Sequence, residues 1–106
     1  MSKEFKLKFK EKVFAVKREE KGWAIRINAQ SVFLPEDKLP EMLALLDGAF
    51  YGILKDNTSI QAGNGYIVLL RGKDRWGIRI GKENEREVVY LTRLDIRSLY
   101  YFFLLS

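Results

Sequence analysis

Alternating apolar and basic residues open the chain. Phe5, Leu7 and Phe9 alternate with lysines through residue 10, which is the two-residue period of a strand with one buried face. The alternation slips near residues 11–12 and indicates a bulge or a bend. Further strands are predicted over residues 13–17, 23–28 and 32–34, with a turn over 19–22.

A helix is predicted to follow the strands. Pro35 and Pro40 open it, because proline is tolerated in a first helical turn. Its apolar residues fall on one stripe, which consists of Leu39, Met42, Leu43, Leu46 and Phe50. Gly48 and Gly52 are predicted to mark its end. Residues 55–65 are rich in Asp, Asn, Thr, Ser and Gly, and are predicted to form a short polar linker.

The second half of the chain repeats the first. Trp23-Ala24-Ile25-Arg26-Ile27 recurs as Trp76-Gly77-Ile78-Arg79-Ile80, and the match extends backward so that Arg18 falls on Arg71. After four extra residues in the second copy, 32–34 matches 89–91. The alternative is two amphipathic hairpins that look alike because both alternate. We expect an α+β domain of two tandem β-β-β(-β)-α repeats, about 1–54 and 60–106, with pseudo-twofold symmetry and curved antiparallel sheets packed on helices.

The last helix is unusually apolar. It is predicted from Arg93 onward, after a capping box formed by Thr92 and Asp95. Residues 99–105 are large and apolar on every face of a helix, so we expect part of this surface to pair with a second copy in a homodimer. The run is roughly a third of the ~20 residues that a spanning helix needs. Residues 1–12 do not resemble a signal peptide. A cytoplasmic protein that does not cross the membrane is therefore expected, with association with the nucleoid as a variant.

The composition argues against catalysis. The chain has no cysteine and no histidine, so thiol nucleophiles, zinc–thiolate sites and the commonest general base are absent. None of the carboxylates is paired at a spacing that suggests acid–base work. We therefore expect a protein that is not an enzyme, with no cofactor and no metal.

Basic residues instead gather on strands and turns. The 106 residues carry 19 Lys and Arg against 14 Asp and Glu, a net charge of +5. Arg26 and Arg79 lie opposite the Trp and Ile face of their strands, which favours a track for a phosphate backbone. The alternative is a solvated face that only prevents aggregation. Trp23 and Trp76 share a face with isoleucines and are predicted to be core. The candidate nucleic-acid-binding residues are Lys6, Lys8, Lys10, Lys17, Arg18, Arg26, Arg71, Lys73, Arg75 and Arg79.

The order of these elements resembles a known family. Residues 14–27 look like the first hairpin of the PUR repeat, and Val32-Phe33-Leu34-Pro35 resembles its short strand running into a helix. The single-repeat plan is similar to that of the positive-cofactor-four and Whirly proteins. The resemblance implies two intertwined repeats that hold single-stranded DNA or RNA on their sheets. The alternative is a structural or protein-interaction module of the same fold, whose apolar last helix binds a partner.

Overall fold

Each half of the chain builds one sheet and one helix. The computed structural model describes residues 3–54, 57–82 and 84–106. The first half contains β1 (Glu4–Lys8), β2 (Val13–Glu19), β3 (Gly22–Ile27), β4 (Gln30–Pro35), the 3-10 turn η1 (Glu36–Lys38) and α1 (Leu39–Phe50). The second contains β5 (Thr58–Ala62), β6 (Gly65–Arg71), β7 (Trp76–Lys82), β8 (Glu85–Leu91) and α2 (Arg93–Leu105). Both sheets are four-stranded and antiparallel, in chain order, so the α+β class is confirmed.

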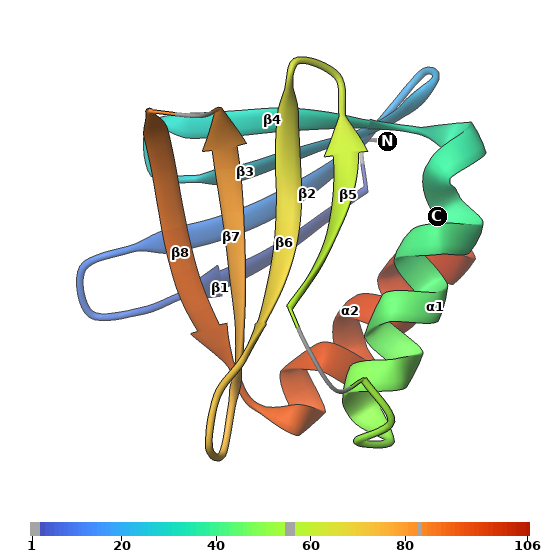
Figure 1. Cartoon of the computed structure of the whole chain (residues 1–106). Coiled ribbons are helices and arrows are strands. Elements are labelled where there is room, and N and C mark those ends of the chain that lie inside the picture. Colours follow the sequence, from blue (N-terminus) through green and yellow to red (C-terminus); the bar gives the residue numbers. More distant parts are fainter. Residues whose placement is uncertain (1–2, 55–56, 83) are drawn as a thin grey trace.

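The inner faces of the two sheets share one core with the helices. Figure 1 shows the β5–β8 sheet in front, its strands running across those of β1–β4, with α1 and α2 side by side at one edge. Residues from both sheets and both helices form a single buried cluster, which includes Ile25, Ile78, Leu46 and Phe103. We call the opposite face of each sheet the outer face.

Cross-strand registers place matching residues of the two halves in matching rows. Arg18–Trp23–Leu34 forms a row of the first sheet, and Arg71–Trp76–Leu91 forms a row of the second. Residues 23–27 and 76–80 are both strands, and both isoleucine pairs, Ile25 with Ile27 and Ile78 with Ile80, are buried. The alternation in each motif therefore predicted the strands and the buried isoleucines correctly, whereas Trp76, which was predicted to be core, is only half-buried.

The predicted linker is wrong over most of its length. Residues 58–62 form β5, and Ile60 and Ala62 are buried in the core. The polar residues Thr58, Ser59 and Gln61 made this segment resemble a linker, although its alternation places two residues in the core. Residues 55–56 lie outside the described residues. Gly48 lies inside α1 and does not end it, whereas Gly52, with a φ of 72°, follows the helix as expected.

Helix α2 is buried on one side and open on the other. The predicted capping box is present, since Asp95 N–H donates to Thr92 Oγ1 and Thr92 N–H donates to Asp95 Oδ2. Ile96, Leu99 and Phe103 are buried, and the Phe5 ring covers Phe102 at a centroid distance of 5.8 Å. The more exposed side chains are Leu94, Tyr101, Leu104 and Leu105. Among the described residues, no helix is long and apolar enough to cross a membrane.

Arg97 fastens α2 to α1. Its Nη1 donates to Asp47 Oδ1 at 3.0 Å and its Nη2 to the Tyr51 hydroxyl at 3.2 Å, while the Phe50 ring centroid lies 4.4 Å from its guanidinium. Desolvation alone would lower the pKa of Arg97. The hydrogen bond to Asp47 and the nearby Tyr101 and Tyr51 hydroxyls outweigh it, so that this pKa is raised. The ion pair with Asp47 and the stacking on Phe50 therefore link the two helices.

Candidate nucleic-acid interface

The outer face of the first sheet carries cations around a floor of small residues. Lys6, Ala15, Arg26 and Ser31 are cross-strand neighbours in one row, and Lys17, Ala24 and Phe33 follow one another in the next. The small side chains leave a hollow of about 430 Å³, lined by Glu4, Ala15, Lys17, Ala24, Arg26 and Ser31. The predicted cations Lys17 and Arg26 therefore meet at one site.

Lys6, Lys8 and Lys10 lie at the edge of this sheet. Lys6 and Lys8 are exposed on the outer side of β1, and Lys10 is exposed in the turn that follows. Lys6 Nζ lies 3.9 Å from Glu4 Oε1, a loose and exposed ion pair that contributes little to stability. None of the three lines the hollow described above. They can add long-range attraction for an anion at the sheet edge.

The outer face of the second sheet is richer in arginine and tyrosine. Arg79 has Val68 and Val88 as cross-strand neighbours, and the next row runs Gln61–Tyr66–Gly81–Arg86. Gly81 has a φ of 135°, and a Cβ there would lie 2.0 Å from the Glu85 carbonyl oxygen, so only glycine fits. The absence of a side chain leaves an opening between Tyr66 and Arg86. The resulting hollow of about 430 Å³ is lined by Asn57, Ser59, Tyr66, Val68, Arg79, Ile80, Gly81, Lys82 and Arg86.

A third hollow joins the two outer faces. It has a volume of about 420 Å³ and is lined by Glu19, Ala24, Ser31, Val32, Phe33, residues 62–65 and Lys82. It shares Ala24 and Ser31 with the hollow on the first sheet, and Lys82 with the hollow on the second. The β5–β6 turn lies against β4, because a Cβ on Gly63 would be 3.6 Å from the Phe33 carbonyl oxygen. We call these three adjoining hollows the track.

Exposed rings accompany the cations of the track. Phe33 is 38% exposed and Tyr66 is 49% exposed, and each lines one of the hollows. Tyr90, 50% exposed, lies beside the track over Gly77, where a Cβ would be 3.0 Å from its ring. Sequence reasoning left both tyrosines unplaced, and it missed Lys82 and Arg86. The period of two along β6 and β8 puts Tyr66 and Arg86 on the Arg79 side, and this signal could have found them.

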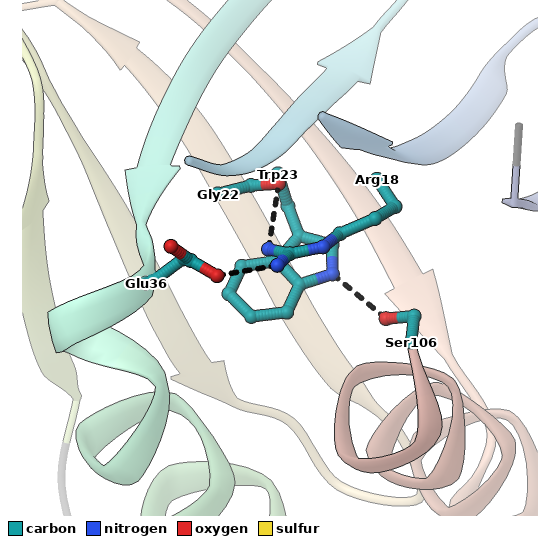
Figure 2. Close-up of polar contacts among 5 residues, drawn as sticks. All are labelled: Arg18, Gly22, Trp23, Glu36 and Ser106. Carbon is teal, nitrogen blue, oxygen red and sulfur yellow. Dashed lines mark hydrogen bonds and ion pairs between the residues drawn. The ribbon is translucent and has the colours of Figure 1, made fainter. Parts of the chain in front are cut away.

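Arg18 is not on the track. It shares the inner side of its sheet with Trp23, and its guanidinium lies 4.5 Å from the Trp23 ring centroid. Its Nη1 donates to the Gly22 carbonyl oxygen at 3.1 Å, and its Nη2 is paired with Glu36 (Figure 2). Trp23 Nε1 in turn donates to Ser106 Oγ at 2.8 Å. Arg18 thus holds the Trp23 corner together, a structural role that the candidate assignment did not anticipate.

Arg71, Lys73 and Arg75 lie together elsewhere. They line a separate pocket of about 320 Å³ at the β6–β7 turn, beside Trp76 and Arg93. Among the described residues, none lines both this pocket and the track. Of the ten predicted residues, the structure therefore brings Lys17, Arg26 and Arg79 onto the track and these three into a pocket of their own.

Basic side chains outnumber acidic ones among the described residues of the track. Lys17, Arg26, Arg79, Lys82 and Arg86 are cations, against Glu4 and Glu19 as the acidic lining residues described. Within the described ranges, no group of three or more His, Cys, Asp or Glu side chains is placed to hold a metal ion. Comparisons with protein-family models, curated proteins and solved structures give no significant match.

Proposed function

We propose that this protein binds single-stranded nucleic acid along the track and acts as a binding protein, not as an enzyme. The observation that carries the proposal is the run of three adjoining hollows, with cations from both sheets and exposed Phe33 and Tyr66 rings. Lysine and arginine neutralise phosphates, while aromatic rings stack on unpaired bases. The phosphates and the bases of a single strand thus both have binding partners on one surface.

The rings favour a single strand over a duplex. A base can stack on Tyr66 or Phe33 only when its face is exposed, and in a duplex that face is covered by the neighbouring base pairs. Contacts of cations with phosphates and of rings with bases depend little on the base sequence. We therefore propose a preference for single strands over duplexes and no strong sequence preference.

The proposal includes a two-repeat organisation of the PUR type. It is supported by the shared order of four strands and then an α-helix in the two halves, and by the matching rows through Trp23 and Trp76. In this proposal a near-twofold rotation relates the halves, and the track passes from one repeat to the other at Lys82. An experimentally determined structure in which the two Trp-Ile-Arg-Ile strands superpose under such a rotation would support it. Halves related in any other way would contradict it.

Fluorescence anisotropy tests the binding proposal. Labelled single-stranded DNA, single-stranded RNA and duplex DNA are titrated over a salt series. We expect the single strands to bind more tightly, with log affinity falling linearly as log salt rises. Arg79→Ala and Tyr66→Ala should each weaken binding several-fold. Lys38→Ala, outside the track, serves as the matched control. Absence of binding at low salt would refute the proposal.

A second surface favours self-association. Phe5, Tyr101, Phe102 and Leu105 line an open and almost wholly apolar hollow on α2, and Leu105 is 71% exposed. A patch of this kind usually marks an interface, and a twofold axis lets it pair with itself. Each large side chain buried contributes about 1.5–3 kcal/mol. We propose a homodimer through α2. Such a dimer is equally compatible with the alternative function, a protein-interaction module that binds no nucleic acid.

Light scattering at micromolar concentration tests the dimer. Leu105→Glu should yield monomers or insoluble protein, because it would place a charge in the apolar contact. Ile53→Glu is the matched control, since Ile53 is equally exposed, at 71%, but lies outside α2. A well-behaved monomer of the unchanged chain would exclude this interface and leave the track proposal untouched.

A further inference from the structure

The hairpin between β7 and β8 is longer than its counterpart between β3 and β4. The β3–β4 pairing ends at Ile27, whereas the β7–β8 pairing continues past the matching Ile80 through two further residue pairs. The two pairs are formed by Gly81, Lys82, Glu85 and Arg86. The four extra residues of the second copy account for this extension, which lies in the front sheet of Figure 1.

The extension helps to form the hollow on the outer face of the second sheet. Gly81, Lys82 and Arg86 all line this hollow of about 430 Å³. Tyr66 is the cross-strand neighbour of Gly81, and its side chain is 49% exposed. The hollow on the first sheet is lined by Glu4, Ala15, Lys17, Ala24, Arg26 and Ser31. Of these two hollows, only the second therefore has an aromatic ring beside its cations.

One row of the second hollow places three kinds of side chain in order. Ser59, Val68 and Arg79 are cross-strand neighbours on β5, β6 and β7, and all three line the hollow. Neighbouring strands lie about 4.8 Å apart, so the backbones at Ser59 and Arg79 are about 10 Å apart. Tyr66 lies two residues before Val68 on the same face, which makes it a diagonal neighbour of both Ser59 and Arg79. A hydroxyl, an apolar side chain and a guanidinium thus follow one another beside a ring.

The polar side chains of this row are accessible to a ligand. Ser59 is exposed, and Arg79 is half-buried. In the part of the chain that the structure describes, no ion pair involves Arg79 or Arg86, and no side chain hydrogen-bonds to the Ser59 hydroxyl. Asn57, which also lines the hollow, already accepts the Arg71 backbone N–H with its Oδ1. Ser59 and Arg79 can therefore exchange solvent for the polar groups of a ligand without breaking a contact of the fold.

We infer that this hollow binds one ribonucleotide of a single-stranded RNA, so that the protein binds RNA more tightly than DNA of the same sequence. The inference rests on the proposed binding of single strands along the track. Tyr66 stacks on the base, and Arg79 binds the phosphate. Val68 lies between the serine and the arginine as the sugar carbons lie between the 2′-hydroxyl and the phosphate. Ser59 therefore contacts the 2′-hydroxyl, the group by which a protein distinguishes RNA from DNA.

The first sheet presents a serine and an arginine without this spacing. Ser31 is the direct cross-strand neighbour of Arg26, with no apolar side chain between them. Both side chains can reach the same phosphate, a group that RNA and DNA share. We therefore assign the discrimination between RNA and DNA to the second sheet, and Ser31 provides a matched control for Ser59.

Fluorescence anisotropy at low salt tests the inference with short single strands that contain only adenine, so that RNA and DNA carry identical bases. We expect RNA to bind about two- to tenfold more tightly, the effect of one net hydrogen bond. RNA with 2′-fluoro sugars keeps the sugar shape of RNA but has no 2′-hydroxyl, and should bind like DNA. Equal affinity of RNA and DNA, or 2′-fluoro RNA that binds as tightly as RNA, would overturn the inference.

Substitution of the serine locates the discrimination. Ser59→Ala should lower the affinity for RNA to that for DNA and leave the affinity for DNA unchanged. Ser59→Thr keeps the hydroxyl and should retain the preference for RNA. Ser31→Ala is the control and should leave the ratio of the two affinities unchanged. Circular dichroism checks the fold of each variant. A preference for RNA that persists undiminished in Ser59→Ala would contradict the assignment.

Failure of this inference and failure of the track proposal give different results. If RNA and DNA bind with equal affinity, only the ribonucleotide site is wrong, whereas absence of binding by either strand refutes both proposals. Tyr66→Ala and Arg79→Ala should weaken RNA and DNA alike, because both strands have bases and phosphates. Adenosine 5′-monophosphate should displace the RNA strand only at millimolar concentration, since it occupies one of the three hollows. Displacement at the concentration of the strand itself would make a free nucleotide the ligand and overturn the inference.

Discussion

Trp23 and Trp76 open the same five-residue strand motif in the same register, yet one is sealed and the other borders a pocket. Trp23 is covered by the Phe103 ring at a centroid distance of 5.4 Å and donates its indole N–H to Ser106. Phe103 lies in α2 and Ser106 caps the end of that helix, so both partners belong to the other half of the chain. Trp76 meets the end of α1, where Ala49 and Gly52 are small. The strand motif therefore determines on which face of the sheet the tryptophan lies and which residues are its cross-strand neighbours. The helix end that packs against the tryptophan determines how far its side chain is exposed.

The largest effect that would test this comparison is on stability. Trp23→Ala removes a fully buried ring and should lower the free energy of unfolding by about 3–5 kcal/mol. Trp76→Ala removes a half-buried ring and should cost less than half as much. Urea denaturation followed by circular dichroism measures both values. Equal losses would show that the two tryptophan side chains are packed alike.

The outer faces provide the next test. Arg79→Ala removes a cation that lies near Tyr66 and Arg86, and should weaken single-strand binding several-fold. Arg26→Ala, at the matching position on the lysine-rich face, should weaken it less. Each should lower the slope of log affinity against log salt by somewhat under one. Denaturation midpoints should barely move, and wild-type binding by both variants would place the ligand elsewhere.

The two halves differ in how the chain passes from the last strand of the sheet into the helix, because only the second half has a side-chain N-cap. The first half enters its helical segment without a side-chain cap, whereas Thr92 and Asp95 form a capping box before α2. Thr92→Ala should therefore cost about 1 kcal/mol of stability. Ser98→Ala, on the exposed side of the same helix, is the control and should change the thermal midpoint little. A Thr92→Ala variant as stable as the control would mean that the packing of α2 alone holds its first turn.

The smallest expected effect concerns the ion pair between Arg18 and Glu36, beside Trp23. The Arg18 and Glu36 side chains are 25% and 52% exposed, so solvent screens their attraction. Glu36→Gln should cost about 0.5 kcal/mol or less at low salt, and nothing measurable at 1 M salt. Arg93→Gln should instead lower stability slightly at both salt concentrations, because it removes the hydrogen bond to the Phe50 carbonyl oxygen and the stacking on the Phe50 ring. Thermal unfolding over a salt series decides whether only the Glu36→Gln effect is lost at high salt.

Local patterns predicted much of this structure and missed one strand. Alternation around Trp23 and Trp76 predicted β3 and β7 with their buried isoleucines, and the spacing of Thr92 and Asp95 predicted the start of α2. β5 was missed because its polar residues resemble a linker and only Ile60 and Ala62 reach the core. Arg18 was assigned to binding by residue type, although its parity with Val16 places it on the inner face.

The sequence by itself determined the α+β class, the strands at 23–27 and 76–80 with their buried isoleucines, and the strongly apolar character of α2. These follow from periods of two and about 3.6 residues, which depend only on near neighbours along the chain. Only the tertiary structure decided that Lys82 connects the hollows of the two sheets, that Ser106 closes the Trp23 corner, and that Arg71 and Arg93 share a pocket. Each of these contacts joins residues from separate elements, and their distance in space depends on how the sheets and helices pack.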